Sequence, residues 1–455
     1  MDRLMVSVSG VRGTVGRTLT PDVARDFGRA FAAMLGQGKT VVIGRDTRPS
    51  GPMVRDAVTA GLLELGVNAI DLGVVTTPGV ALMTRRLRAD GGVVVTASHN
   101  PAEYNGIKFL QPSGPGLRAG DAERLKRIWS AGGFQLADAE HRGVESEDPR
   151  THQEHVEAVC AVVDVQAVAA KRFAVVLDSI NGAGCVVTPM LLERLGCELV
   201  HINAEPTGRF AHQPEPIREN LSQLCEAVRG RRSVAGFAQD PDGDRLVIMD
   251  ESGECIGEEY TLALATAFVL RGRKGKVATN MVTSRMIDDV ARAAGCEVVR
   301  APTGEANVVE AMEKAGCLFG GEGNGGVIDP RVVPVRDSLV GMAFVLQYMA
   351  ETGKSVRQLV AEIPRYVMIK TKMPCPPDAA GAVAAAAREA FSGRADARFN
   401  DADGLRVDLP DGWVSVRASN TEPIMRICAE AREARLAEAF VAQVRKIAEA
   451  ILAGK

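Results

Sequence analysis

The clearest pattern along the chain is a unit of alternating apolar and amphipathic stretches that occurs three times. Each copy has an apolar run, a polar or glycine-bearing turn, an amphipathic stretch and a second apolar run. The first apolar runs cover residues 40–44, 173–178 and 275–279. Gly66, Gly196 and Gly295 end the amphipathic stretches, where a helix C-terminus favours the left-handed conformation. The pattern predicts three related βαβ-type domains.

The pattern changes after residue 366. Prolines at 374, 376 and 377 interrupt the chain, and an alanine-rich stretch over 378–391 predicts a helix. Short apolar runs flank Asp411-Gly412, which is typical of a hairpin. Apolar residues then recur at helical spacing in the last 20 residues, at Leu436, Phe440, Val444, Ile447 and Ile451. These features predict a smaller α+β domain, attached through a hinge at 374–377.

A chain of 455 residues is too long for one hydrophobic core, which agrees with several domains. We expect an α/β fold of four domains: three related mixed-sheet domains and a smaller C-terminal α+β domain. The expected boundaries are 1–150, 151–256, 257–366 and 367–455.

Composition narrows the function classes. Aromatic residues make up only 4% of the chain and the net charge is -3, so neither base stacking nor a basic field favours nucleic acid. The nine cysteines are scattered without a Cys-x-x-Cys pair, and we expect them to be reduced. No apolar run reaches about 18 residues, so we expect no membrane segment and a cytoplasmic location.

The first chemical motif follows the apolar run 93–95 and reads Thr-Ala-Ser-His-Asn-Pro over residues 96–101. It presents Ser98 at a strand end, although a Ser-His-Asn-Pro sequence also suits an ordinary turn. Lys108 lies ten residues further on, where a strand could bring its amine back to Ser98 as an acid, a base or a phosphate partner. The alternative for Lys108 is a solvated surface side chain.

The second motif is Asp-Pro-Asp-Gly-Asp-Arg over residues 240–245. Asp240, Asp242 and Asp244 would repel one another on one loop unless a cation lay between them, which predicts a site for a hard divalent metal such as Mg²⁺. The alternative is an EF-hand with Glu251 at its twelfth position. Arg245 argues against it, because the sixth position of such a loop requires glycine.

The third motif is the glycine-rich stretch 319–327, which lets the backbone approach a ligand closely. Glu322 and Asn324 offer acceptors and donors for sugar hydroxyls, while a flexible connector would have a similar composition.

The fourth motif, residues 413–423, has a strand, a polar loop and a proline. Its loop contains Arg417, Ser419, Asn420 and Thr421, a composition suited to a phosphate dianion. A hairpin turn would account for the serine, the asparagine and the proline but not for Arg417. Near the N-terminus, Arg12 lies in a second glycine-framed segment, residues 9–16.

These four loops, in this order and one per domain, resemble those of the α-D-phosphohexomutase family over essentially the whole chain. The resemblance implies four domains around a central cleft and a serine, Ser98, that carries phosphate. It further implies that Ser98 and the three aspartates hold Mg²⁺. The groups around the transferred phosphoryl group would be Arg12, His99, Lys108 and Arg245. Glu322 and Asn324 would bind the sugar, and Arg417, Ser419, Asn420 and Thr421 the phosphate that does not react.

The resemblance implies a mutase that interconverts the 1- and 6-phosphates of a hexose or hexosamine through a bisphosphate intermediate, as a monomer or homodimer. The sugar loop departs from many relatives, which have Gly-Glu-Met-Ser-Gly-His or Gly-Glu-Gln-Ser-Gly-His. Here Gly326 replaces the histidine. The loop is similar to an archaeal-type branch, which favours glucosamine phosphate over glucose or mannose phosphate. A phosphatase and a non-catalytic sugar-phosphate binding protein are the rival functions.

Overall fold

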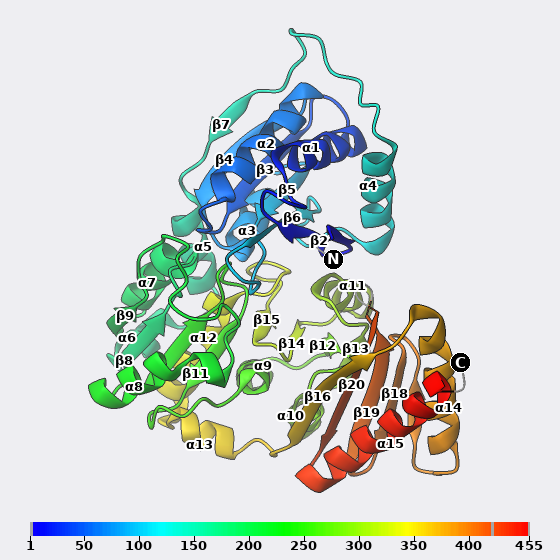
Figure 1. Cartoon of the computed structure of the whole chain (residues 1–455). Helices are drawn as coiled ribbons and strands as arrows, with labels where there is room; N and C mark the ends of the chain where they lie inside the picture. Colours follow the sequence, from blue (N-terminus) through cyan, green and yellow to red (C-terminus); the bar gives the residue numbers. More distant parts are fainter. Residues whose placement is uncertain (1–2, 420–422, 454–455) are drawn as a thin grey trace.

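The computed structural model describes residues 3–419 and 423–453, and it contains four sheets, each with its own helices (Figure 1). The N-terminal sheet has the strand order β1-β2-β6-β5-β3-β4-β7. Its strands are β1 Met5–Ser7, β2 Gly10–Thr14, β3 Thr40–Arg45, β4 Asn68–Val74, β5 Gly91–Val95, β6 Tyr104–Leu110 and β7 Glu145–Glu147. The helices of this part are α1 Pro21–Leu35, α2 Gly51–Glu64, α3 Thr77–Arg86 and α4 Ala119–Ala131.

The second sheet has the order β11-β10-β8-β9. Its strands are β8 Ala174–Asp178, β9 Glu198–Ile202, β10 Ala235–Gln239 and β11 Leu246–Met249. The helices around it are α5 Thr151–Cys160, α6 Val165–Ala169, α7 Gly184–Arg194, the 3₁₀ turn η1 Arg218–Asn220 and α8 Ser222–Arg231.

The third sheet has the order β13-β12-β14-β15. Its strands are β12 Val277–Asn280, β13 Val298–Ala301, β14 Phe319–Glu322 and β15 Gly326–Ile328. The helices are α9 Glu258–Gly272, α10 Met286–Ala293, α11 Glu305–Ala315, α12 Ser338–Thr352 and α13 Val356–Ala361.

The three predicted units share one topology. In each, two strands joined by a helix run parallel: β3 with β4, β8 with β9 and β12 with β13. A third parallel strand is followed by an antiparallel one, in the pairs β5–β6, β10–β11 and β14–β15. Gly66, Gly196 and Gly295 have φ of +77°, +69° and +69°, as the helix ends require. The first three motifs are therefore equivalent loops, each joining a third strand to its antiparallel neighbour.

The C-terminal sheet is antiparallel, with the order β16-β20-β19-β18-β17. Its elements are β16 Val367–Pro374, α14 Pro377–Ser392, β17 Arg398–Asn400, β18 Leu405–Leu409, β19 Gly412–Ala418, β20 Ile424–Ala431 and α15 Ala434–Ala453. The hairpin at Asp411-Gly412, the alanine-rich helix and the final helix are confirmed. This part has its own apolar core, whereas one continuous core joins residues of the first three sheets and their helices.

The predicted hinge at 374–377 is wrong. Residues 367–374 of β16 pair with 431–424 of β20, so Pro374 belongs to the sheet, and α14 begins at 377. A proline is tolerated there because β16 is an edge strand. The connection to the third sheet is instead the segment 362–366, which follows α13 and contains Pro364.

Arg285 joins the third and fourth parts of the fold, just before α10. Its guanidinium donates to the carbonyl oxygens of Leu409, Pro410 and Gly412 at 2.8, 3.1 and 2.8 Å, and its backbone N–H donates to Glu430. The C-terminal domain therefore has a core of its own and meets the third domain through polar contacts at Arg285.

Candidate active site

Ser98 lies in the loop between β5 and β6, and it meets the metal-loop motif there. Its hydroxyl donates a hydrogen bond of 2.8 Å to Oδ2 of Asp240, and Oγ lies 3.3 Å from Nδ1 of His99. The residue is only 2% exposed and has φ of +49°, which is unfavourable for a side chain with a Cβ. Strain of this kind persists where surrounding contacts hold the backbone, and it is typical of functional positions.

Those contacts come from Asp46 and Arg48, which the sequence analysis did not single out. Arg48 is fully buried and donates to the carbonyl oxygens of Ser98 and Asn100, both at 2.6 Å, and to those of Pro101 and Tyr104 at 2.7 and 2.9 Å. Asp46 holds the guanidinium at 3.1 Å. Both residues follow β3, the parallel neighbour of β5. The sequence did contain a signal for them: Asp46 and Arg48 come directly after an apolar strand, and the carboxyl ends of adjacent parallel strands lie together.

The aspartate loop between β10 and β11 is held by the other two mixed-sheet domains. At the start of α3, Thr77 donates its backbone N–H to the Asp242 carbonyl at 2.9 Å and its hydroxyl to the Asp242 carboxylate at 2.6 Å. At the start of α12, the Ser338 hydroxyl donates to the Gly243 carbonyl at 2.6 Å. The loop conformation therefore depends on three domains at once.

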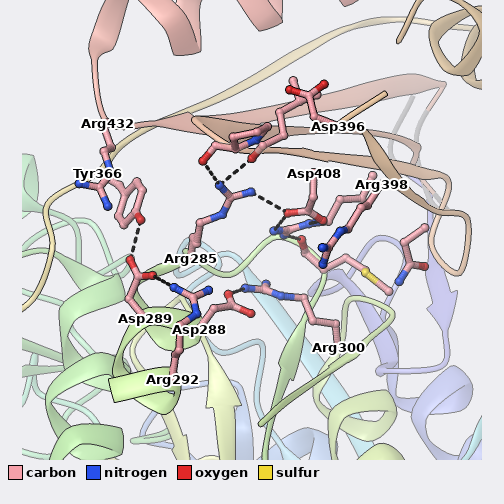
Figure 2. A pocket seen from close by; sticks show the side chains of 15 residues that line it. Arg285, Asp288, Asp289, Arg292, Arg300, Tyr366, Asp396, Arg398, Asp408 and Arg432 are labelled. Atoms are coloured by element: carbon pink, nitrogen blue, oxygen red, sulfur yellow. Dashed lines mark hydrogen bonds and ion pairs between the residues drawn. The ribbon is translucent and has the colours of Figure 1, made fainter. Parts of the chain in front are cut away.

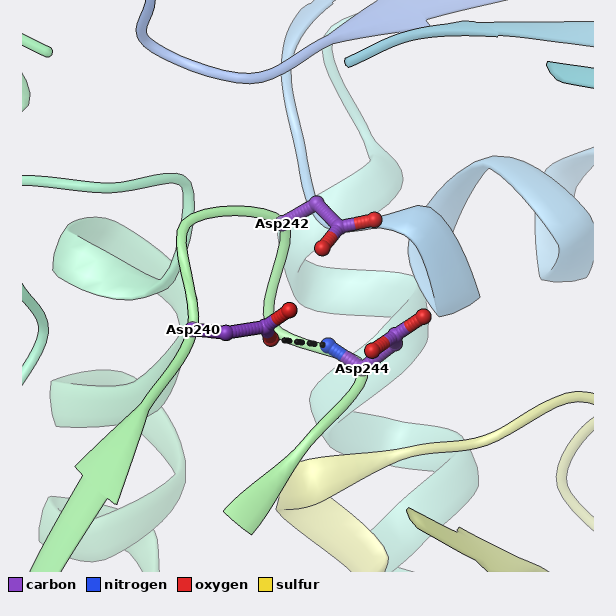
Figure 3. Close-up of side chains that lie close together, drawn as sticks. All are labelled: Asp240, Asp242 and Asp244. Carbon is purple, nitrogen blue, oxygen red and sulfur yellow. Dashed lines mark hydrogen bonds between the residues drawn. The ribbon is translucent and has the colours of Figure 1, made fainter. Parts of the chain in front are cut away.

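The three aspartates are buried and bring one oxygen each within 4.8 Å of the others (Figure 3). Oδ1 of Asp240 accepts the backbone N–H groups of Asp244 and Arg245, both at 3.1 Å. Oδ1 of Asp242 and Oδ1 of Asp244 are buried without a hydrogen-bond partner. Burial, together with the two neighbouring carboxylates, raises the pKa of Asp240 well above its ordinary value. Buried acceptors without donors and crowded negative charge fit a divalent cation.

Lys108, on β6, lies with its amine 2.6 Å from Oδ2 of Asp242 and 3.5 Å from Oδ2 of Asp244. Burial alone would lower the pKa of Lys108, but Asp242 and Asp244 raise it above its ordinary value. Conversely, although burial disfavours the Asp242 carboxylate, Lys108 keeps the pKa of Asp242 low. Lys108 is therefore a cation in this site, and of the three roles expected for it the phosphate partner fits its charge.

The EF-hand alternative does not fit the position of Glu251. Its carboxylate accepts from the Ser355 hydroxyl and from the Arg357 backbone N–H, the latter at 3.3 Å. Residues 246–249 form β11 rather than the start of a helix.

The glycine-rich loop between β14 and β15 packs directly on the aspartate loop. The backbone N–H of Leu246 donates to the carbonyl of Gly325 at 3.0 Å, and a Cβ at Gly325, which has φ of +84°, would overlap the Leu246 backbone. Glu322 accepts from Asn280 at 2.8 Å and from the Gly304 backbone N–H at 3.1 Å. Oδ1 of Asn324 is buried without a hydrogen-bond partner, so an acceptor is available here.

Arg336 connects the two loops, and no motif in the sequence predicted it. Its guanidinium donates to Asp244 at 2.6 Å and to Glu322 at 3.0 Å. It follows β15 by eight residues, in a connection without a motif of its own, so no local signal marked it.

The other predicted arginines, Arg12 and Arg245, contact the serine loop and the aspartate loop. Nη1 of Arg12, on β2, donates to the side chain of Asn100 at 3.2 Å, and Nε of Arg245 lies 3.9 Å from Asp244. Burial, followed by the nearby Arg245 and Arg12, lowers the pKa of His99 to about 2, so its imidazole is neutral.

The fourth motif begins on β19 of the C-terminal domain. Arg417 lies 3.5 Å from Asp403, whose carboxylate also accepts the Thr303 backbone N–H at 2.9 Å. A local partner therefore exists for Arg417, contrary to the expectation that a hairpin gives this arginine no reason to be there. The backbone N–H of Ser419 donates to the Ile424 carbonyl at 2.9 Å. Asn420 and Thr421 lie outside the described residues.

A cavity of about 490 Å³ between the third and fourth domains is separate from this cluster (Figure 2). Six arginines and four aspartates are among the 15 residues around it, and none of the predicted site residues is. Its more buried arginines already have partners: Arg285 donates to three carbonyls, and Arg300 donates to the carbonyls of Asn280 and Thr283 at 2.9 and 2.7 Å. Arg285 bonds across the two domains, whereas the Arg300 bonds lie within the third domain.

Four family models match the chain in succession. They describe α/β/α domains I, II and III and the C-terminal domain of phosphoglucomutase/phosphomannomutase, and they match residues 3–135, 153–253, 257–366 and 368–447. A phosphoglucomutase/phosphomannomutase of Thermococcus kodakarensis is 39% identical over 98% of each chain. The chain belongs to the phosphoglucomutase/phosphomannomutase family.

Other relatives agree with this family and differ in the sugar in their names. A protein of Methanopyrus kandleri named as a phosphoglucosamine mutase is 38% identical, over 97% of this chain and 98% of its own. The crystal structure of a phosphoglucomutase/phosphomannomutase family protein from Burkholderia thailandensis is 27% identical over 98% of each chain, with a TM-score of 0.86.

The sequence led us to expect no membrane segment and reduced cysteines. Among the described residues, no helix is long and apolar enough to cross a bilayer. All nine cysteines are free thiols.

Proposed function

We propose that this phosphohexose mutase interconverts the 1-phosphate and the 6-phosphate of a hexosamine or hexose, with Ser98 as the phosphate carrier. The observation that carries the proposal is the hydrogen bond from the Ser98 hydroxyl to Asp240, inside a buried cluster of three carboxylates. A serine that only turned the chain would need neither the strained backbone nor this neighbour.

Asp240, Asp242 and Asp244 would hold the metal, which we propose is Mg²⁺ because all the candidate ligands are hard oxygens. Bound there, the ion would supply positive charge against the oxygens of the phosphoryl group. Neighbouring residues orient Asp242 for the ion. Thr77 and Lys108 donate to Oδ2 of Asp242, so Oδ1 remains free to bind the metal.

In the forward step, the bond between Ser98 Oγ and phosphorus breaks and phosphorus bonds to the free sugar hydroxyl. The proton of that hydroxyl ends on Ser98 Oγ, and Asp240 and the neutral His99 lie close enough to pass it on. Lys108, Arg12 and Arg245 neutralise the charge that spreads over the phosphoryl oxygens. The bisphosphate must then turn over and return its other phosphate to Ser98, which a movable C-terminal domain permits.

Glu322 and Asn324 would bind the sugar, and the loop with Arg417, Ser419, Asn420 and Thr421 the phosphate that does not react. We propose glucosamine phosphate as the preferred substrate, supported by the glycine-rich sugar loop and by the relatives named phosphoglucosamine mutase. Phosphoglucomutase or phosphomannomutase activity is the alternative, supported by the Thermococcus kodakarensis relative.

Two measurements test the proposal. Peptide mass spectrometry should locate phosphate on Ser98, and Ser98→Ala should lower turnover by several orders of magnitude, while Ser113→Ala, at an exposed turn, should not. Coupled assays on the glucosamine, glucose and mannose phosphates should favour glucosamine phosphate by about five- to a hundredfold in kcat/KM, the value of one or two hydrogen bonds.

The rival functions give different results in the same assays. Phosphate on another residue would refute the carrier assignment. If kcat/KM for glucosamine phosphate is equal to or below that for glucose or mannose phosphate, the protein is a phosphoglucomutase or phosphomannomutase. Release of inorganic phosphate in place of an isomerised sugar would indicate a phosphatase, and no turnover of any sugar phosphate would indicate a binding protein.

A further inference from the structure

Gly326 stands where the sugar loop of many relatives has a histidine, and the structure shows what occupies the space. A Cβ at Gly326 would overlap Cδ of Arg336 and come within 2.7 Å of Cγ. Gly326 is not among the glycines with positive φ, so its backbone would accept a side chain. Space, rather than backbone conformation, therefore explains the glycine at this position.

The methylene stem of Arg336 fills this space, and its guanidinium donates to three carboxylates. Nη2 donates to Oδ2 of Asp244 at 2.6 Å, Nη1 to Oε2 of Glu322 at 3.0 Å and Nε to Oε2 of Glu305 at 3.0 Å. The side chain is only 12% exposed. A histidine has two ring nitrogens and could not join three carboxylates, whereas the planar fork of arginine can.

These contacts leave free the acceptors that the reaction needs. Asp244 gives Oδ2 to Arg336, and its Oδ1 is the buried oxygen without a donor. A carboxylate has about four acceptor positions. Three of the acceptor positions of Glu322 accept hydrogen bonds from Asn280, Gly304 and Arg336. The fourth position, on Oε2, is left for a sugar hydroxyl.

We propose that Arg336 takes over the place of the loop histidine as a positioning residue, which orients Asp244 for the metal and Glu322 for the sugar. Gly326 and Arg336 then form one exchangeable pair, in which a side chain at 326 requires the loss of the one at 336. The inference rests on the proposed function, because it takes Asp244 as a metal ligand and Glu322 as a sugar ligand.

The first test separates positioning from stability. In Arg336→Ala, we expect the KM for the sugar phosphate and the dissociation constant of Mn²⁺, followed by its electron paramagnetic resonance signal, each to rise at least tenfold. Arg331→Ala is the matched control, because Arg331 lies on the same connection and pairs with the buried Asp329 at 2.6 Å, away from the cluster. It should change neither value more than about threefold.

Arg336→Lys guards against a variant that does not fold, since it keeps the stem and one charge. It should fold and still show a raised KM, because an amine cannot reproduce the fork. A lower melting temperature in the Arg336 variants with unchanged KM and Mn²⁺ affinity would make Arg336 a purely structural residue and overturn the proposal.

The second test is a double-mutant cycle. Gly326→His alone should lower kcat/KM at least tenfold, because the imidazole collides with Arg336. In the Arg336→Ala background the same change should raise kcat/KM, a reversal of sign that independent positions do not give. Additive losses would contradict the exchange.

The proposed function and the role of Arg336 can be refuted separately. If the wild type carries phosphate on Ser98 and isomerises sugar phosphates while the cycle is additive, only the role of Arg336 is wrong. If Mn²⁺ binding is unaffected by Asp242→Asn, the metal site itself is wrong, and with it the basis of this inference.

Discussion

Arg48 donates a 2.6 Å hydrogen bond from Nη2 to the backbone carbonyl of Ser98. With three further carbonyls on the same guanidinium, it fixes the backbone of the serine loop, and no other buried side chain contacts that loop through so many bonds in the part of the chain described. Arg48→Lys should lower the free energy of unfolding by about 2 to 4 kcal/mol, because several buried carbonyls lose their donor.

The same variant should transfer phosphate more slowly, since Ser98 then relaxes from its strained conformation. Urea unfolding and the rate of phosphate transfer measure the two effects. Arg45→Lys, at a partly buried position three residues earlier, is the control and should behave as the wild type. Full stability in Arg48→Lys would show that the loop holds its own conformation.

The metal site predicts a contrast between two acidic residues. Asp244→Asn should weaken activation by Mg²⁺ at least tenfold, because one charged ligand is lost. Glu251→Gln should leave the Mg²⁺ titration unchanged, since its carboxylate bonds to Ser355 and Arg357. Removing the metal should abolish activity with little change in melting temperature. A large stabilisation by Ca²⁺ that depends on Glu251 would restore the EF-hand reading.

Arg417 and Asp403 together test the distal phosphate site. Charge-assisted hydrogen bonds contribute about 1.5 to 3 kcal/mol, so Arg417→Ala should weaken sugar-phosphate use by about ten- to a hundredfold. In a single-turnover chase of labelled phosphoserine, transfer to the sugar should slow, and loss to water should not. Asp403→Asn removes the ion pair but keeps the guanidinium, so it should have a much smaller effect. Equal losses in both variants would mean that Arg417 acts only through Asp403, which bonds to Thr303 of the third domain.

Glu259, in the first turn of α9, predicts a pH dependence of stability. Burial raises the pKa of Glu259 to about 8, although Lys370 approaches to 3.4 Å and opposes the shift, while Glu258 and Glu430 add to it. The folded state therefore binds the proton of Glu259 more tightly than the unfolded state does, so protonation of Glu259 stabilises the fold. Its contribution is complete below the ordinary pKa of a glutamate and is lost as the pH rises through about 8.

The free energy of unfolding should thus fall by up to about 1.4 kcal/mol per pH unit between pH 5 and 8. In Glu259→Gln, an uncharged isostere, urea titrations at several pH values should show a flatter profile. Glu258→Gln, on the adjacent and more exposed residue, serves as the comparison. An unchanged slope in Glu259→Gln would mean that Glu259 is ionised throughout.

Local patterns were enough to predict the repeated units and the four loops, because a strand that ends in polar residues is visible in the sequence. They could not identify Arg48 or Arg336. Their partners, Ser98 and Asp244, lie 50 or more positions away along the chain, and which residues meet depends on which strands are neighbours in a sheet. The proline hinge was wrong for a related reason: Pro374 looks like a break in sequence, and only the strand order reveals an edge position. Within the site, Lys108 on its strand was predicted, but its charge state follows from carboxylates in another domain.

The Arg285 contact constrains some positions of this interface and leaves others free to vary. The arginine donates hydrogen bonds to the backbone carbonyl oxygens of residues 409, 410 and 412, which every amino acid possesses. The exposed Pro410 and Asp411 can therefore be substituted without loss of the Arg285 hydrogen bonds, whereas Leu409 is buried and a Cβ at Gly412 would overlap the Glu430 carbonyl. Among related sequences we expect an arginine at 285 that faces a turn in which 410 and 411 vary and 409 and 412 do not.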